Sequence, residues 1–157
     1  AKLILIDAAG YPLKSTSVPI AFRIARTPVL NKILTFITPR FVVESSVLNV
    51  YADKSKVTDP LVDRYFELSL RAGNRQALID RMQMPFDSNS VRKIPNIDQH
   101  TLILWGGRDG LIPLKSAYRF QRDLPNDTLV ILENSGHVPM EEDPEESLEV
   151  VLQFISK

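Results

Sequence analysis

Two residues in the second half of the chain have the types and the setting that acid–base chemistry requires. Asp109 lies in the glycine-rich segment 106–110, and His137 follows Ser135-Gly136 further along the chain. A carboxylate next to an imidazole orients the ring and stabilises its protonated form, so such a pair can act as a general base. Each residue also has a structural interpretation, because Asp-Gly is a common turn pair and a lone histidine is often a surface group. The pair can act as a general base only if the fold brings the two side chains together.

Each of the two residues follows a predicted strand. Residues 101–105 and 128–132 are short apolar runs, typical of strands that are buried on both faces of a parallel sheet. A third run of this kind, residues 2–6, lies at the start of the chain. Because ligands gather outside the carboxyl ends of parallel strands, we expect the loops that carry Asp109 and His137 to lie side by side.

The long segment between the first two predicted strands is typical of helices. Three prolines follow a good N-cap residue, and apolar residues recur at helical spacing after each of them. Helices are therefore expected to begin at Thr27-Pro28, Thr38-Pro39 and Asp59-Pro60, with a shorter helix over 75–82 and another near 18–25.

Two more helices are expected in the C-terminal part, one over 114–122 and one after Asp143, where Glu146 completes a capping box. The resulting order is strand, helices, strand, helix, strand, helix. This order favours an α/β fold with a parallel sheet and right-handed crossovers. Residues 12–95 are much longer than an ordinary connection, so we expect an inserted helical layer there on a core formed by residues 1–11 and 96–157.

Composition narrows the function classes. Of the 157 residues, 44% are hydrophobic and 24% charged, as in a globular domain. The 19 basic and 19 acidic residues cancel, so no net field attracts nucleic acid or an anionic membrane, and we expect no nucleic-acid partner. The basic excess in residues 1–95 is dispersed, which favours a solvated face over an RNA-binding segment. The chain has no cysteine and two histidines, which argues against a disulfide framework and a metal centre, and we expect no cofactor.

Three motifs in this order resemble the α/β-hydrolase-fold enzymes. Residues 102–113 resemble the strand and acid segment of that family, and residues 135–145 resemble the segment that carries its catalytic histidine. Residues 3–10 resemble the strand that precedes the helical cap of these enzymes, and the helical segment lies where that cap is inserted. The resemblance covers nearly the whole chain, least clearly in the cap. It implies a partial α/β-hydrolase fold of three parallel strands with flanking helices and an inserted cap.

By the same resemblance, Asp109 is the acid of a catalytic triad and His137 is its general base. The family's nucleophile is a serine in a Gly-x-Ser-x-Gly elbow that precedes both residues in the chain. None of the six glycines here brackets a serine in that pattern, and the chain begins directly on a predicted strand without a methionine. We therefore expect the C-terminal half of a hydrolase, whose missing half holds the nucleophile, so that this half is inactive alone. Serines inside the chain are poor substitutes, namely Ser15, Ser17, Ser45, Ser46 and Ser135.

The resemblance implies a hydrolase of small apolar substrates, in the manner of an esterase. Carbon–carbon bond hydrolysis, epoxide hydrolysis and dehalogenation stay open, because one fold hosts many reactions. The side chains expected around the substrate are Phe22, Phe36, Phe41, Ile112 and Val138.

A second class of function is a non-enzymatic half-domain. Its edge strand, residues 2–7, would leave backbone groups unpaired and could bind a second copy, another partner, or the missing half of a split hydrolase. Three further features have structural interpretations. We expect His100 to be structural, Trp105 to lie in the core, and the acidic run 141–146 to supply favourable charge to a helix N-terminus rather than a metal site.

Overall fold

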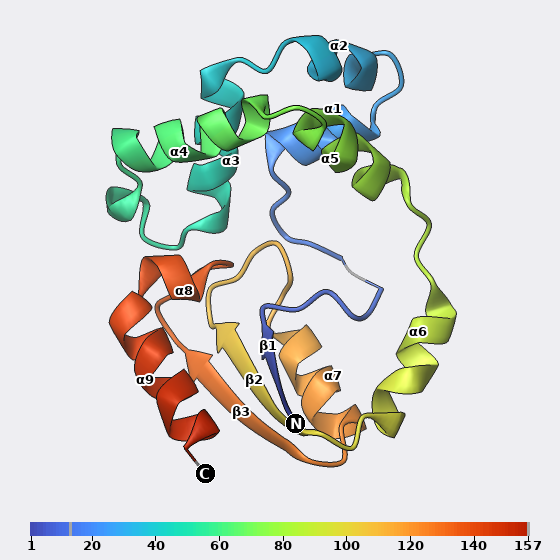
Figure 1. Cartoon of the computed structure of the whole chain (residues 1–157), viewed down its shortest axis with the longest axis vertical. Helices are drawn as coiled ribbons and strands as arrows, with labels where there is room; N and C mark the ends of the chain where they lie inside the picture. Colours follow the sequence, from blue (N-terminus) through green and yellow to red (C-terminus); the bar gives the residue numbers. More distant parts are fainter. Residues whose placement is uncertain (13, 157) are drawn as a thin grey trace.

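The core of the molecule is a parallel sheet of three strands (Figure 1). The computed structural model describes residues 1–12 and 14–156 of the chain. The strands β1 (Lys2–Ile6), β2 (His100–Gly106) and β3 (Asp127–Leu132) lie in the order β1-β2-β3. The central strand β2 is the most deeply buried, which explains its unbroken apolar sequence. The predicted α/β class with a parallel sheet is confirmed.

Helices cover both faces of the sheet, because alternate residues of β2 point to opposite sides. On one face, Ile103 and Trp105 pack with Phe120 of α7 (Lys115–Asp123). On the other, Leu102 and Leu104 pack with Phe154 of α9 (Pro144–Ile155). The short helix α8 (Pro139–Glu142) leads into α9. The expected core position of Trp105 is confirmed.

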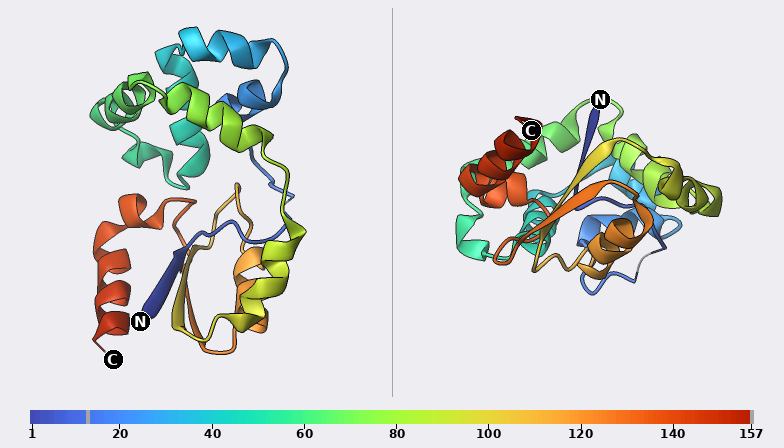
Figure 2. Two further views of the ribbon diagram at one scale, coloured as in Figure 1. Left: turned by 45° about the vertical axis from the view of Figure 1, so that its right-hand side comes forward. Right: turned by 90° about the horizontal axis from the view of Figure 1, so that it is seen from below.

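The segment between β1 and β2 forms helices, of which α1 to α5 lie beyond the carboxyl ends of the strands and α6 lies beside the sheet (Figures 1 and 2). A small apolar cluster of Ala25, Leu34 and Ile79 holds three of these helices together. The helices are α1 (Ile20–Arg26), α2 (Leu30–Phe36), α3 (Arg40–Val50), α4 (Asp59–Leu70), α5 (Asn74–Gln83) and α6 (Ser88–Lys93), with short 3₁₀ turns at Lys54–Lys56 and Ile94–Asn96. We call α1 to α5 the helical layer.

The last helix of the segment, α6, packs against the core of the sheet. Val91 and Ile94 lie in the apolar cluster around Trp105, although both fall within the predicted insertion 12–95. The chain therefore passes from the helical layer to the sheet core between α5 and α6, before the expected boundary at residue 95. Sequence periodicity marks a helix but not the surface that the helix packs against.

None of the three N-caps predicted before a proline is the cap of its helix. The Thr27 hydroxyl donates a hydrogen bond to the carbonyl of Arg23 (2.8 Å), and the Thr38 hydroxyl donates to that of Leu34. A threonine can bond backward to the carbonyl four residues earlier, so these residues close the preceding helix instead of opening the next. In α4, Thr58 is the cap, and Asp59 is the first helical residue.

In the part of the chain that the structure describes, no single helix is long and apolar enough to cross a membrane. The pair α2 and α3 has the required length and composition together, but its two axes are bent by 109°.

Candidate active site

Asp109 lies in the turn that follows β2, and backbone groups of the same turn hold its side chain in place. Its side chain is fully buried. The backbone N–H groups of Leu111 and Ile112 both donate to Oδ1, at 2.8 and 2.9 Å. Oδ2 is therefore the oxygen that remains for another group.

His137 supplies that group. Its Nδ1 lies 2.8 Å from Oδ2 of Asp109. Because an ionised carboxylate only accepts hydrogen bonds, Nδ1 carries the proton and Nε2 is left as the nitrogen that can take one up. The backbone N–H of His137 donates to the carbonyl of Val50 at the end of α3 (2.8 Å), which fixes the residue from the side of the helical layer. The two side chains singled out in the sequence are thus in direct contact.

The contact depends on two loops that touch backbone to backbone. The N–H of Arg108 donates to the carbonyl of Ser135 (3.0 Å), and that of Gly107 donates to Leu132 (2.8 Å). A side chain at Gly106 would overlap the carbonyl oxygen of Gly136. Gly136 in turn lies against backbone atoms of residues 50–52. Both glycines are needed for this close approach.

Replacing Gly136 with alanine should move the histidine loop. The added methyl group would collide with the Val50 carbonyl and the Ala52 amide, which are backbone atoms and cannot rotate away. We expect a loss of about 1–3 kcal/mol in the free energy of unfolding, measured by urea denaturation. Ser45→Ala on the exposed side of α3 is the matched control and should change it by under about 0.5 kcal/mol. Equal stability of the two variants would contradict the tight fit.

A third titratable residue, Asp7, faces this pair and was not assigned by the sequence analysis. It follows β1, has a positive φ of 42° and is only 3% exposed. Its Oδ1 accepts a hydrogen bond from the N–H of Gly106 (3.0 Å), and its Oδ2 is buried without a partner among the described residues. Atoms of Asp7, Asp109 and His137 lie within 4.8 Å of one another.

Burial raises the pKa of Asp7 to about 9, with the nearby charge of Asp109 acting in the same direction and the Gly106 N–H opposing it. Asp7 is therefore protonated at neutral pH. The available signal in the sequence was an acid directly after a buried strand, since Asp7 follows β1 and Asp109 comes three residues after the end of β2.

Asp7→Asn should make the stability of the protein less dependent on pH. The pKa of Asp7 is near 3.8 in the unfolded chain and about 9 in the folded one. Between these values the folded state holds a proton that the unfolded state has lost, so stability falls as pH rises, by at most about 1.4 kcal/mol per pH unit. Asparagine carries no such proton. The variant should match the wild type near pH 4 and exceed it increasingly up to pH 9, in urea denaturation series.

Asp98→Asn, at an exposed aspartate, is the control for this series and should leave the wild-type slope unchanged. A variant D7N whose stability runs parallel to the wild type over the whole range would contradict a protonated Asp7.

The same three residues also satisfy the spacing of a cation site. Both oxygens of Asp109 are, however, already engaged, by two backbone N–H groups and by the imidazole. A metal would have to displace these bonds. The donor set fits proton chemistry between carboxylate and imidazole better than metal coordination.

Glu142 joins the histidine loop to the helical layer. It is 3% exposed, and its carboxylate accepts hydrogen bonds from the backbone N–H groups of Gly136 (2.7 Å), Asp53 (2.6 Å) and Ala52 (3.1 Å). Its neighbour Glu141 accepts hydrogen bonds on one oxygen from Tyr51, Tyr65 and Arg64.

These contacts correct the interpretation of the acidic run. Glu145 and Glu146 do lie in the first turn of α9, as expected. Glu141 and Glu142 instead bind the helical layer. The predicted capping box is wrong, because the side chain of Asp143 makes no cap hydrogen bond and accepts from Lys56 and Ser135.

The helical layer forms a partly open apolar cavity of about 230 Å³. Phe22 lines it, as does Val50, whose carbonyl binds the His137 amide. Phe36 and Phe41 do not line it and are 79% and 63% exposed. The remaining lining is formed mainly by Leu34, Val43, Val47, Tyr65 and Leu78.

The other predicted substrate contacts lie near the pair of Asp109 and His137. Ile112 is buried in the sheet core and donates its N–H to Asp109. Val138 is half-buried, next to His137 and just before α8. His100 begins β2 at the opposite end of the sheet, where it packs on the ring of Phe154 at 4.8 Å.

Three of the five serines considered as substitutes are engaged elsewhere. The Ser135 hydroxyl donates to Asp143, and that of Ser46 donates to the Val42 carbonyl. Ser17 accepts a hydrogen bond from Asn49. Within residues 1–12 and 14–156, no hydroxyl group is hydrogen-bonded to Nε2 of His137.

Comparisons with known proteins agree with this architecture. The chain is 28% identical to an uncharacterized hydrolase of Bacillus subtilis, over 98% of the chain and 56% of that protein. Over 54% of its length it is 31% identical to a pimeloyl-[acyl-carrier protein] methyl ester esterase of Vibrio vulnificus, of which it covers 33%. A 2-hydroxy-6-oxo-6-phenylhexa-2,4-dienoate hydrolase of Rhodococcus has the same fold, with a TM-score of 0.77 at 15% identity, over 99% of this chain and 55% of that one.

The chain thus spans about half the length of the curated relatives it matches. Residues 1–150 match the model of the alpha/beta hydrolase family. With the parallel sheet, the resemblance of the motifs and this match in agreement, the chain belongs to the alpha/beta hydrolase family.

Proposed function

We propose that this chain provides the acid and the base of a serine-type hydrolase that cleaves small apolar esters. The observation that carries the proposal is the hydrogen bond between Nδ1 of His137 and the buried carboxylate of Asp109. It leaves Nε2 free to act as a base, in the arrangement that nucleophilic hydrolases use.

The nucleophile in this proposal is a serine supplied by a segment outside this chain. Nε2 of His137 takes the serine proton as the serine oxygen attacks the ester carbonyl, and Asp109 stabilises the imidazolium that forms. The imidazolium then gives its proton to the leaving alcohol. Water, activated by the same nitrogen, releases the acid from the acyl-enzyme and regenerates the serine.

The substrate class is inferred from the cavity in the helical layer. Its lining is apolar and includes Phe22 and Leu34, and Val50 links it to the backbone of His137. An apolar acyl or alcohol group fits such a lining, because burial there removes it from water at no polar cost. Val138 would flank the reacting bond, whereas the Ile112 side chain is buried in the sheet core and its N–H holds Asp109. Residues 12–95 would then act as the cap, as in the resemblance described above.

The chain alone is proposed to be inactive and to pair through β1. Among the described strands, β1 has a neighbour on one side only, so its other edge offers unpaired backbone groups to a further strand. The missing half of the sheet would add there. The relatives of about twice the length support this proposal. The edge also favours the second candidate, a half-domain that associates with itself.

One experiment separates these proposals. The isolated chain should hydrolyse p-nitrophenyl butyrate no faster than the same concentration of His137→Ala chain. Co-expression with a segment that supplies the proposed missing strands and their Gly-x-Ser-x-Gly serine should produce turnover, and the same pair with H137A should not. Turnover by the isolated chain would contradict the missing nucleophile. An inactive reconstituted pair, with a stable dimer of the isolated chain in light scattering, would favour the half-domain.

A further inference from the structure

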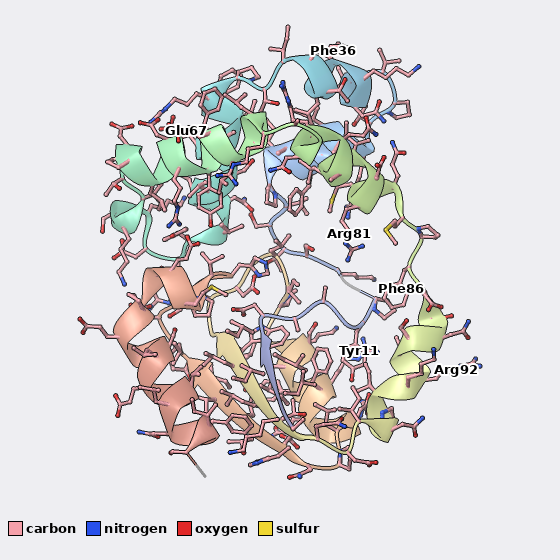
Figure 3. All side chains as sticks on the ribbon, viewed as in Figure 1. Tyr11, Phe36, Glu67, Arg81, Phe86 and Arg92 are labelled. Atoms are coloured by element: carbon pink, nitrogen blue, oxygen red, sulfur yellow. The ribbon has the colours of Figure 1, made fainter. Side chains whose placement is uncertain are left out.

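The helix α2 presents apolar side chains to solvent. Only Leu34 of this helix is buried, and it packs in the cluster of the helical layer. Phe36 is 79% exposed and extends away from the molecule at its outer end (Figure 3). We call the exposed apolar side chains of α2 and its flanks the α2 patch, which consists of Val29, Leu30, Ile33, Phe36, Ile37 and Phe41.

The patch is continuous along the chain and lies at one end of the molecule. Ile33 and Phe36 are three residues apart in α2, so they share one side of the helix. In two views, α2 is at the end opposite to the sheet (Figures 1 and 2). A broad flat surface can therefore reach the patch without touching the sheet or the open edge of β1. Contiguous exposed apolar side chains of this kind mark interaction sites.

The charge around the patch indicates what covers it. Residues 8–43 contain five basic residues and no acidic one. Arg40 is engaged by Glu44, Asp59 and Asp63. The other basic residues near α2 are exposed, namely Arg23, Arg26 and Lys32. The zero net charge of the chain hides this local excess.

An apolar face with basic residues beside it is typical of helices that lie in the surface of a membrane containing anionic lipids. A second copy of the chain is a poorer fit, because a symmetric contact would bring the same basic residues towards one another. We propose that the α2 patch docks onto a lipid bilayer that contains anionic phospholipids.

The inner side of α2 faces the apolar cavity, so docking would bring the bilayer close to that cavity. Leu34 of α2 lines the apolar cavity while the patch lies on the outer side of the helix. Only one helix would separate the docked bilayer from the cavity, so apolar molecules dissolved in the membrane would have a short path into it. This path for the substrate rests on the proposed function, whereas the docking does not.

The test is co-sedimentation of the full chain with vesicles of phosphatidylcholine, with and without phosphatidylglycerol. We expect binding to the mixed vesicles that weakens with salt. Phe36→Ser should weaken it about tenfold, as removal of one inserted aromatic side chain. Arg26→Gln and Lys32→Gln should each weaken it about fivefold on mixed vesicles and leave phosphatidylcholine binding unchanged.

Phe86→Ser is the matched control, since Phe86 is also half exposed but lies between α5 and α6, away from the patch (Figure 3). It should bind as the wild type does, and circular dichroism should find all variants folded. Failure of the chain to sediment with mixed vesicles, or equal binding by F36S and F86S, would overturn the proposal. So would a dimer in light scattering that F36S dissociates, because the patch would then be a contact between copies.

Discussion

If the proposed function holds, His137→Ala in the reconstituted hydrolase should lower kcat for ester hydrolysis by about 10⁶-fold, as removal of the base does in serine hydrolases. The imidazole is the group that can accept the serine proton, and its Nδ1 is already fixed on Asp109. The backbone of the residue keeps its hydrogen bond to Val50, so the loop should stay in place. The measurement is a pre-steady-state and steady-state assay with p-nitrophenyl butyrate, together with a thermal unfolding curve.

The control for this prediction is the other histidine. His100→Ala removes a ring that packs on Phe154 at the opposite end of β2. It should affect the unfolding temperature but leave kcat within about twofold. If H137A kept a rate within tenfold of the wild type, the general base would have to be another group.

Asp109→Asn should lower kcat by about 10⁴-fold with little change in KM. An asparagine can still accept the hydrogen bonds from Leu111 and Ile112 on its oxygen, which preserves the turn. Its NH₂ group, however, must donate to Nδ1 of His137. The proton of the imidazole then moves to Nε2, which can no longer accept one.

The two effects should not add when both substitutions are combined. His137→Ala/Asp109→Asn should be about as slow as His137→Ala alone, because Asp109 acts only through the imidazole. Additive losses would indicate that Asp109 contacts the substrate directly. Asp123→Asn at the end of α7, outside the site, provides the control and should leave kcat unchanged.

Much of the core could be predicted because its signals are local. The apolar runs that become β1, β2 and β3 are short and unbroken, and they have no helical alternative of the required length. The pairing of Asp109 with His137 follows from one further rule, that neighbouring parallel strands end at the same edge.

The contacts that the sequence did not predict join residues that lie far apart in the chain. Glu142 binds backbone groups of Ala52 and Asp53, about 90 residues away, and no local pattern distinguishes it from the helix-capping acids that follow it. Asp7 faces the site only because β1 pairs with β2 in one register, which depends on the whole intervening segment. Tertiary pairing, not local propensity, determines both positions.

The predicted pocket residues illustrate another limit. Phe22 and Phe36 both lie in short apolar helices, yet only Phe22 lines the cavity. In a helix of seven residues that is apolar on several sides, periodicity does not distinguish the inner side from the outer one. The direction of Phe36 depends on how α2 packs, which the sequence does not encode locally.

The links between the histidine loop and residues 50–53 also constrain how the helical layer can move. Three hydrogen bonds join them: the Val50 carbonyl accepts from the N–H of His137, and the N–H groups of Ala52 and Asp53 donate to the carboxylate of Glu142. These bonds fix this corner of the layer to the histidine loop, whereas α2 and α5 make none of them. A displacement of α2 or α5 would therefore leave in place the bonds that hold the backbone of His137.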